Sequence, residues 1–309
     1  MREAENSTSG TGFLRTIKRK GEKMTITDVR VLPGDASFLL DDGESAVLYD
    51  SGFGFTGFGV AENIKKILGE RKLDYIFLTH SHYDHALGSA YILRYWPDAK
   101  VVAGEYAAGI FKRPGAKAVM KDLDGKFAAK NGVAEYEFLG DELRVDLAVN
   151  DGDIVNAGNM TFEVIALPGH TKCSVGYYLQ EEKLLLSSET LGLYNGTEII
   201  TPSFLIGIEI TMNSIRKMKE YDVERMVSPH YGCLSKEETK FFLENMERSS
   251  AEAAAFLKVR LQKGMPKEQM IAEFKKIYCE GYMREIYPED AVNLNTSIMI
   301  DLVAKECLE

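Results

Sequence analysis

The residues of this chain most suited to chemistry are its histidines, of which there are only five. Three of them lie in the segment His80-Ser81-His82-Tyr83-Asp84-His85, which places four potential metal ligands within six residues. Imidazole and carboxylate groups are suitable ligands for zinc or iron. Burying so many titratable groups together is costly unless a metal binds them. The segment therefore indicates a metal site.

The segment directly follows an apolar run at residues 75–78, which is typical of a strand. In an extended chain, residues two apart point to the same side, so His80 and His82 can bind one metal. If the chain then turns into a helix, Asp84 and His85 are redirected and can reach a second metal beside the first. The spacing thus predicts two adjacent metal positions.

The other two histidines occupy similar places in the sequence. His170 lies in Leu-Pro-Gly-His-Thr after a predicted strand ending near Ala166, and His230 lies in Ser-Pro-His-Tyr-Gly after one ending near Ser228. Loops at strand ends are where α/β folds place their active sites. A single histidine at a strand end is more often a hydrogen-bonded structural residue, and for His230 alone that interpretation would be favoured.

The elements that must position these residues alternate between strands and helices. After a Gly-rich stretch at residues 51–59, a helix is expected at 61–68, and residues 105–150 are expected to form a partly helical insertion. Ser235 and Glu238 match a capping box that opens a long helix, and the chain is predicted to stay helical beyond it. Strands are expected at residues 29–32, 37–40, 46–49, 75–78, 100–103, 161–166, 175–180, 183–187 and 225–228. The pattern favours a layered α/β domain with an all-α appendage.

Composition limits the functional class. The chain has 309 residues, 45% of them apolar, and a formal net charge of −10, which argues against a dedicated nucleic-acid binder. The first 23 residues are polar and then basic with no apolar run behind them, so we expect a flexible tail and no membrane segment or export signal. The four cysteines form no CxxC pair and are expected to be reduced thiols. The expected location is cytoplasmic.

Four motifs in this order resemble the metallo-β-lactamase superfamily. They are Asp50-Ser51-Gly52, the Thr-His-x-His-x-Asp-His-x-x-Gly pattern at residues 79–88, Pro-Gly-His-Thr at residues 168–171, and Pro229-His230. The resemblance spans about residues 24–234. It implies a four-layer αβ/βα sandwich over that range. The helical pattern beyond it makes residues 235–309 a C-terminal extension.

The resemblance also implies a ligand set. One metal would be bound by His80, His82 and His170, and the other by Asp84, His85 and His230. The aspartate that normally bridges both metals is replaced here by Glu189, which follows the predicted strand at residues 183–187. Because glutamate is one methylene longer, the metal separation, the occupancy of the second position or the metal preference is expected to differ. The alternative is that Glu189 is a surface residue and the second site is weak.

The activity implied by the resemblance is that of a metal-dependent hydrolase. A hydroxide held by two divalent metals would attack an ester-type small-molecule substrate, such as a thioester, lactone or phosphoester. Zinc is the expected metal, with iron or manganese as alternatives, and Asp84 would both bind metal and receive a proton. Two other functions stay open: an iron-dependent oxidoreductase of the sulfur dioxygenase kind, and a ligand-binding protein with weak turnover. The helical extension would either cap the site or form a homodimer contact.

Two further features have competing interpretations. Residues 52–57 match the GxGxxG pattern of dinucleotide-binding loops, but Asp74 precedes its strand, where it could not contact a ribose. The loop is therefore expected to line the metal site, and its phenylalanines either contact substrate or pack the core. Cys173 and Cys233 lie three residues after His170 and His230. A thiolate ligand is chemically feasible there, although a small buried residue is the commoner role.

Overall fold

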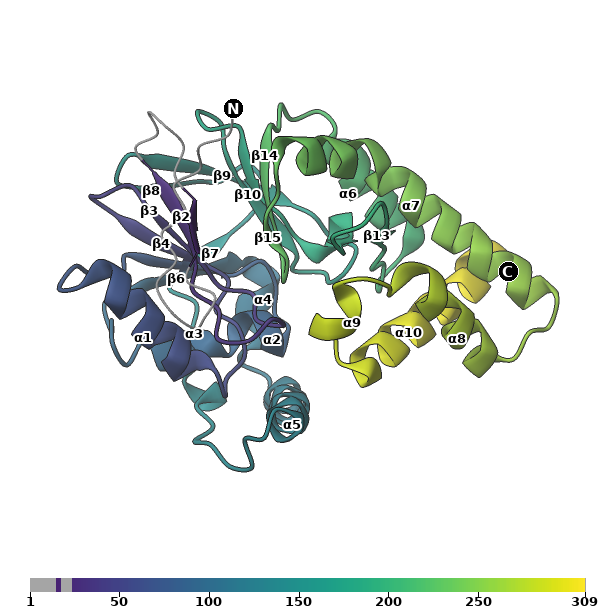
Figure 1. The fold of residues 1–309 in the computed structure, drawn as a ribbon, viewed down its shortest axis with the longest axis horizontal. Coiled ribbons are helices and arrows are strands. Elements are labelled where there is room, and N and C mark those ends of the chain that lie inside the picture. The colour runs from purple at the N-terminus through teal and green to yellow at the C-terminus, as the bar shows by residue number, and fades with distance from the viewer. Residues whose placement is uncertain (1–14, 18–23, 309) are drawn as a thin grey trace. The chain divides into compact units, whose positions relative to one another are not determined.

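The computed structural model describes residues 15–17 and 24–308 (Figure 1). The predicted flexible tail over residues 1–23 lies outside them, except for Arg15–Ile17, which forms β1 and pairs antiparallel with β2. The elements of the first part are β2 (Thr25–Asp28), β3 (Phe38–Asp41), β4 (Ala46–Tyr49), α1 (Gly57–Leu68), β5 (Tyr75–Phe77), α2 (Tyr83–Ala86), α3 (Gly88–Ile92), β6 (Lys100–Gly104), α4 (Glu105–Ile110), α5 (Pro114–Lys130), η1 (Gly140–Glu142), β7 (Leu147–Val149), β8 (Ile154–Ala157) and β9 (Met160–Ala166).

The second part of the chain begins with strands and ends in helices. Its elements are β10 (Val175–Leu179), β11 (Leu184–Leu186), η2 (Glu189–Leu191), β12 (Leu193–Tyr194), β13 (Ile200–Thr201), α6 (Ile208–Met218), β14 (Arg225–Ser228), β15 (Gly232–Cys233), α7 (Lys236–Gln262), α8 (Lys267–Tyr278), α9 (Met283–Ile286) and α10 (Glu289–Leu308). The strands form two main sheets of mixed direction, of seven and six strands. This is the αβ/βα sandwich expected from the resemblance, followed by a helical segment, α7–α10.

The described residues fall into two compact units, each with its own packing. The first contains the described residues up to Ile165 together with Tyr177–Leu179, and the second contains residues 166–176 and 180–308. The boundary predicted between residues 234 and 235 is a different division of the chain and stays a prediction.

The first unit is built on the seven-stranded sheet, in the order β1-β2-β3-β4-β5-β6-β7. Strands β1–β4 pair antiparallel, and β4–β7 pair parallel. All four residues of β4, at the centre of this order, are buried, as expected for an apolar strand that is covered on both faces. Parallel strands need crossover connections, and α1 makes the one from β4 to β5.

The strand predicted at residues 29–32 is wrong, because β2 ends at Asp28 and the chain then enters a loop. The apolar sequence Val-Arg-Val-Leu favours a strand, yet its backbone has other partners. The buried Asp35 carboxylate accepts hydrogen bonds from the backbone N–H of Val31 at 2.9 Å and of Leu32 at 3.0 Å. These two N–H groups therefore bond to a side chain instead of to a neighbouring strand. Aspartate competes with regular secondary structure in this way.

The six-stranded sheet has the order β15-β14-β11-β10-β9-β8. Within the first unit β8 and β9 pair antiparallel, and within the second unit β11 pairs parallel with β14. The last strand, β15, forms a hairpin with β14 and runs antiparallel to it. The strands predicted at residues 161–166, 175–180, 183–187 and 225–228 are confirmed as β9, β10, β11 and β14.

The helical segment begins with the predicted capping box. Ser235 Oγ accepts from the Glu238 backbone N–H at 3.1 Å, while the Glu238 carboxylate accepts from the Ser235 backbone N–H at 2.6 Å. Helices α7, α8 and α10 then bury their apolar faces against one another. The core that they share with Phe204 includes Ala253, Leu257, Met270, Phe274, Met299 and Val303.

Candidate metal centre

The histidine-rich segment has the predicted change of backbone direction. It follows β5, and His82 is still extended, with φ −72° and ψ 153°, as the residue that precedes α2. Asp84 and His85 then lie within α2. The His80 and His85 side chains are fully buried, and those of His82 and Asp84 are partly exposed. The turn into a helix on which the second predicted metal position depends is therefore present.

Asp50 anchors this segment from the end of β4. One carboxylate oxygen, Oδ1, accepts from the Thr79 backbone N–H at 2.8 Å, and the other, Oδ2, lies 2.8 Å from His85 Nδ1. The Thr79 hydroxyl also contacts both oxygens and lies 3.0 Å from His80 Nδ1. Because the Nδ1 atoms of both imidazoles have partners, the Nε2 atoms are the ones available to a metal.

The backbone around Asp50 is held by close contacts that require small residues. Asp50 itself has φ +51°, a left-handed conformation that is uncommon outside glycine. Ser51 donates to the His85 carbonyl from both its backbone N–H and its hydroxyl. A Cβ atom at Gly88 would lie 1.9 Å from the Ser51 carbonyl oxygen, so only glycine fits there. The Asp-x-Gly motif and the glycine at the end of the histidine motif therefore fix each other's position.

His170 follows β9 in the second unit. Its Nδ1 lies 2.7 Å from the Ser203 hydroxyl, and its backbone N–H donates to the Thr190 hydroxyl at 3.0 Å. Thr190 in turn donates to the Leu167 carbonyl at 2.6 Å, which ties the histidine loop to η2. Thr190 and Ser203 are positioning residues that the sequence alone did not indicate, since hydroxyl residues of this kind are common throughout the chain.

Glu189 is the first residue of η2 and is fully buried, so it is not a surface residue. Its Oε1 lies 2.9 Å from His230 Nε2, and its Oε2 lies 3.2 Å from His170 Nε2. The two oxygens of one carboxylate thus face two different histidines. His230 itself has φ +61°, so its loop holds the ring in a left-handed backbone conformation. A third group, the Tyr287 hydroxyl, donates to Oε2 at 2.8 Å.

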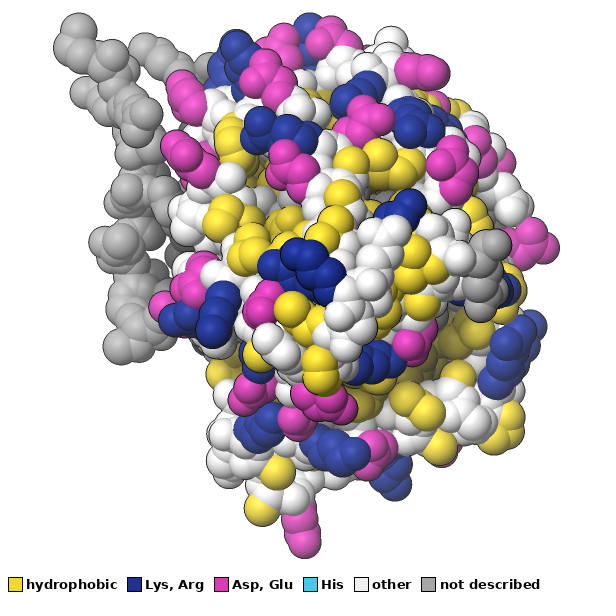
Figure 2. Space-filling model, turned by 90° about the vertical axis from the view of Figure 1, so that its right-hand side faces the viewer, with side chains coloured by type: hydrophobic (Ala, Val, Ile, Leu, Met, Phe, Trp, Pro, Cys, Tyr) yellow, Lys and Arg dark blue, Asp and Glu magenta, His cyan; other side chains and the backbone are white. Residues whose placement is uncertain are grey.

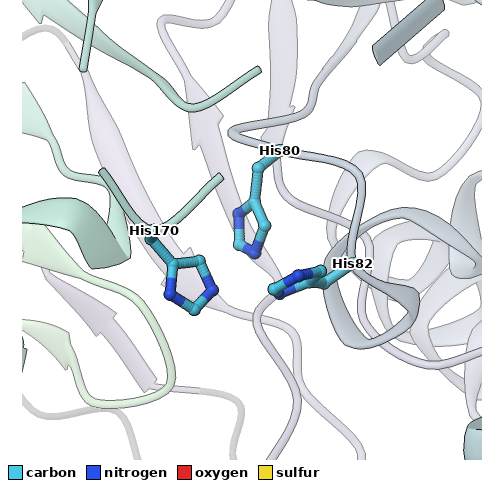
Figure 3. Close-up of side chains that lie close together, drawn as sticks. All are labelled: His80, His82 and His170. Atoms are coloured by element: carbon cyan, nitrogen blue, oxygen red, sulfur yellow. The ribbon is translucent and has the colours of Figure 1, made fainter. Parts of the chain in front are cut away.

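Two groups of potential ligands emerge from the described residues. In each group the ligand atoms lie within 4.8 Å of one another, and they are His80, His82 and His170 in one, and Asp84, His85, Glu189 and His230 in the other. Figure 3 shows the three imidazole rings of the first group turned toward one another. All seven residues predicted as metal ligands are included, and neither group contains Cys173 or Cys233.

The donor set fits divalent metal ions. Imidazole nitrogens and carboxylate oxygens are ligands for zinc, iron and manganese, and the imidazoles of His80, His85 and His170 each have a hydrogen-bonding partner on Nδ1. Two His/Asp groups of this kind indicate a binuclear metal site.

The Gly-rich loop does not have the features of a nucleotide site. Its backbone N–H groups, which would have to contact phosphate, already donate to carboxylates: Phe53 to Asp35, and Gly54 and Phe55 to Asp124. These N–H groups therefore already have acceptors at the place where a phosphate would have to bind. Phe53 is buried and its ring packs against those of Phe55, Tyr83 and Phe127. The packing role considered for the aromatic residues of this loop is therefore present at Phe53.

Comparison with known proteins now decides the family. The model of the metallo-beta-lactamase superfamily matches residues 31–230. The chain belongs to this superfamily. Two curated relatives are Glyoxylase B2 of Dictyostelium discoideum, 28% identical over 46% of this chain, and a probable hydroxyacylglutathione hydrolase of Schizosaccharomyces pombe, 42% identical over 41% of it. The matched regions span only 45% and 38% of those two proteins.

A solved structure agrees with the fold of the superfamily. A metallo-beta-lactamase family protein from Thermus thermophilus is 18% identical and has a TM-score of 0.58, with 91% of this chain and 89% of that chain covered. At this identity the likeness concerns the fold alone. None of the helices in residues 24–308 combines the length and the hydropathy that a membrane span would need.

Proposed function

We propose that this superfamily member is a metal-dependent hydrolase acting on an ester-type small molecule, and that thioesters are the substrate class to test first. The observation that carries the proposal is the division of the Glu189 carboxylate, with one oxygen facing His230 and the other facing His170. A carboxylate in this arrangement can contact two metals. The seven ligands then serve one hydrolytic centre.

The chemistry needs both the metals and the chain's own residues. When bound, two divalent ions would lower the pKa of a coordinated water and polarise the substrate carbonyl. Asp84 is partly exposed, unlike the buried Glu189, so its carboxylate is the one that we expect to receive a proton from the attacking water. Asp50, Thr79 and Ser203 contact the Nδ1 atoms of His85, His80 and His170, so Nε2 is the atom of each ring that would bind a metal.

The choice of thioesters rests on the relatives. Several of the curated proteins that resemble this chain are named hydroxyacylglutathione hydrolases, which act on a thioester as their name implies. Because the matched regions cover less than half of those proteins, the substrate is a proposal for this chain.

The test begins with metal content per chain, measured by elemental analysis of protein purified without added metal or chelator. We expect close to two equivalents, mainly zinc, and turnover of at least one member of a panel of thioesters, lactones and phosphodiesters. The Asp84→Asn variant should keep the fold and lose turnover by about a hundredfold or more. Iron as the main metal together with no ester hydrolysis would overturn the proposal in favour of redox chemistry. Full metal loading with no turnover would favour a ligand-binding role.

We also propose that the helical segment forms a homodimer contact. Four of its large apolar side chains are exposed, namely Val259, Ile277, Leu294 and Leu308. Figure 2 views the side of Figure 1 where α7, α8 and α10 lie, and on it apolar side chains are mixed with charged ones. The mass in solution, measured by light scattering after size-exclusion chromatography, tests this, and a monomer at micromolar concentration would refute it.

A further inference from the structure

Tyr287 belongs to the helical segment, and its side chain contacts two of the candidate metal ligands, Glu189 and His230. It directly follows α9, and its hydroxyl donates to Glu189 Oε2 at 2.8 Å, across 98 positions of sequence. Its ring also packs edge-on against His230, with the ring centroids 5.4 Å apart at an interplanar angle of 80°. One side chain therefore contacts two of the ligands of the same group.

The position of Tyr287 is fixed by packing. Met283 and Ile286 of α9 are buried against Leu193, which lies four residues after Glu189, and Tyr287 packs on the same cluster. The ring of Tyr282 lies against that of Tyr231, next to His230 in sequence. The turn that carries Tyr287 is thus held against the loops that carry Glu189 and His230.

Glu189 needs more support of this kind than an aspartate would at the same position. A glutamate side chain has one more rotatable bond than the aspartate usual at this place in the superfamily, so more conformational freedom is lost when it is held in one geometry. A hydrogen bond to an ionised carboxylate is stronger than one between neutral groups. The Tyr287 hydroxyl contacts Oε2, the oxygen that faces His170, and leaves Oε1 facing His230.

We propose that Tyr287 is a positioning residue, which holds the longer Glu189 carboxylate so that each oxygen faces one ligand group. This inference rests on the proposed binuclear centre. It assigns the helical segment a role in metal binding, in addition to any role in substrate binding or dimer formation. Glutamate at position 189 and tyrosine at position 287 form a matched pair: a shorter carboxylate at 189 would not reach the hydroxyl.

The test is a double-mutant cycle on metal affinity, with Tyr287→Phe, Glu189→Asp and the variant carrying both changes. Tyr287→Phe keeps the ring against His230 and removes only the hydroxyl. Zinc affinity is measured by competition with a chromophoric chelator, and the visible spectrum of the cobalt-substituted protein reports the ligand geometry. Tyr278→Phe is the matched control, because it removes a hydroxyl from a buried tyrosine that packs on Phe274 in the same helical segment.

We expect Tyr287→Phe to weaken binding of the more weakly held zinc by about 10- to 100-fold, the range measured when partners of metal ligands are removed. The cobalt spectrum should change as well, while Tyr278→Phe should match the wild type in both. In the Glu189→Asp background the same Tyr287 change should alter affinity less than about threefold, since the partner oxygen has moved away.

The outcomes separate the two proposals. A wild-type protein that binds two ions, together with a Tyr287→Phe variant of unchanged affinity and spectrum, would overturn the positioning role alone. An equal loss of affinity in both backgrounds would also overturn it, because the hydroxyl would then act without Glu189. A wild-type protein that binds no metal would overturn the binuclear centre and the positioning role together.

Discussion

Asp50→Asn is the substitution that tests most directly how the first unit prepares its ligands. Asp50 is fully buried, accepts from the Thr79 backbone N–H through Oδ1, and contacts His85 Nδ1 through Oδ2. Asparagine has nearly the same shape but only one acceptor oxygen, and its amide nitrogen donates. In either orientation of the amide, its NH₂ group faces another hydrogen-bond donor, which is either the Thr79 backbone N–H or the protonated Nδ1 of His85.

The size of the expected loss in metal affinity and stability follows from the two possible orientations of the amide. With the amide nitrogen toward His85, the imidazole must accept at Nδ1 and carry its proton on Nε2, which blocks the atom available to a metal. With the amide nitrogen toward Thr79, a buried backbone N–H loses its acceptor, at a cost of about 1–3 kcal/mol. The protein takes the cheaper of the two, so the combined loss in metal affinity and stability is expected to be about 1–3 kcal/mol, or roughly 10- to 100-fold in affinity.

The assay pairs zinc affinity, from chelator competition, with urea unfolding of the metal-free protein. Asp74→Asn is the control, because Asp74 also accepts from a backbone N–H, that of Ala46 at 3.0 Å, but precedes β5 instead of following β4. We expect the control to keep the wild-type zinc affinity. An Asp50→Asn protein with both wild-type zinc affinity and wild-type stability would refute this account of His85.

Two further predictions concern stability. Burial raises the pKa of Asp124 from 3.8 to about 6, so the folded state favours the protonated form, and stability is lost as pH rises between those values. A difference of roughly two pKa units corresponds to about 3 kcal/mol, and Asp124→Asn, which cannot ionise, should lose that much less stability than the wild type between about pH 4 and pH 7 in urea unfolding. Equal losses in the two proteins would contradict the assignment. Removing the capping hydroxyl with Ser235→Ala should lower the free energy of unfolding by about 1 kcal/mol and reduce the protection of the Glu238 amide from hydrogen exchange. Ser249→Ala is the control, because it removes a hydroxyl from the middle of α7 and should leave that amide protected; equal protection in both variants would argue against the cap.

Most of the candidate metal centre could be predicted because its residues are concentrated in short motifs. Four of the seven candidate ligands lie in one six-residue segment, where the periods of strand and helix determine which side chains share a direction. His170 and His230 follow strands, and the predicted ends of those strands, near Ala166 and Ser228, are confirmed. Local sequence therefore placed these candidate ligands on the elements that present them; their role as metal ligands stays a prediction.

The residues that support the ligands could not be found in this way. Tyr287 and Ser203 contact Glu189 and His170 across 98 and 33 positions of sequence. A tyrosine or serine has no distinctive pattern around it, and its role depends on which loops the tertiary structure brings together. The same limit explains the strand wrongly predicted at residues 29–32, since the capture of Val31 and Leu32 by Asp35 depends on a loop conformation that hydrophobic periodicity does not encode.

Asp35 also shows why the Gly-rich loop resembles a nucleotide motif without the matching function. The loop needs glycine at position 52 because it has φ +72° there, and a Cβ atom would lie 2.6 Å from Asp35 Oδ1. In a dinucleotide fold the same freedom lets backbone N–H groups approach a pyrophosphate. Here the acceptors that those N–H groups meet are side-chain oxygens of the protein itself, from Asp35 and Asp124. The glycine pattern therefore reflects a loop whose backbone N–H groups bind carboxyl oxygens of the protein itself, where a dinucleotide-binding loop would bind a phosphate.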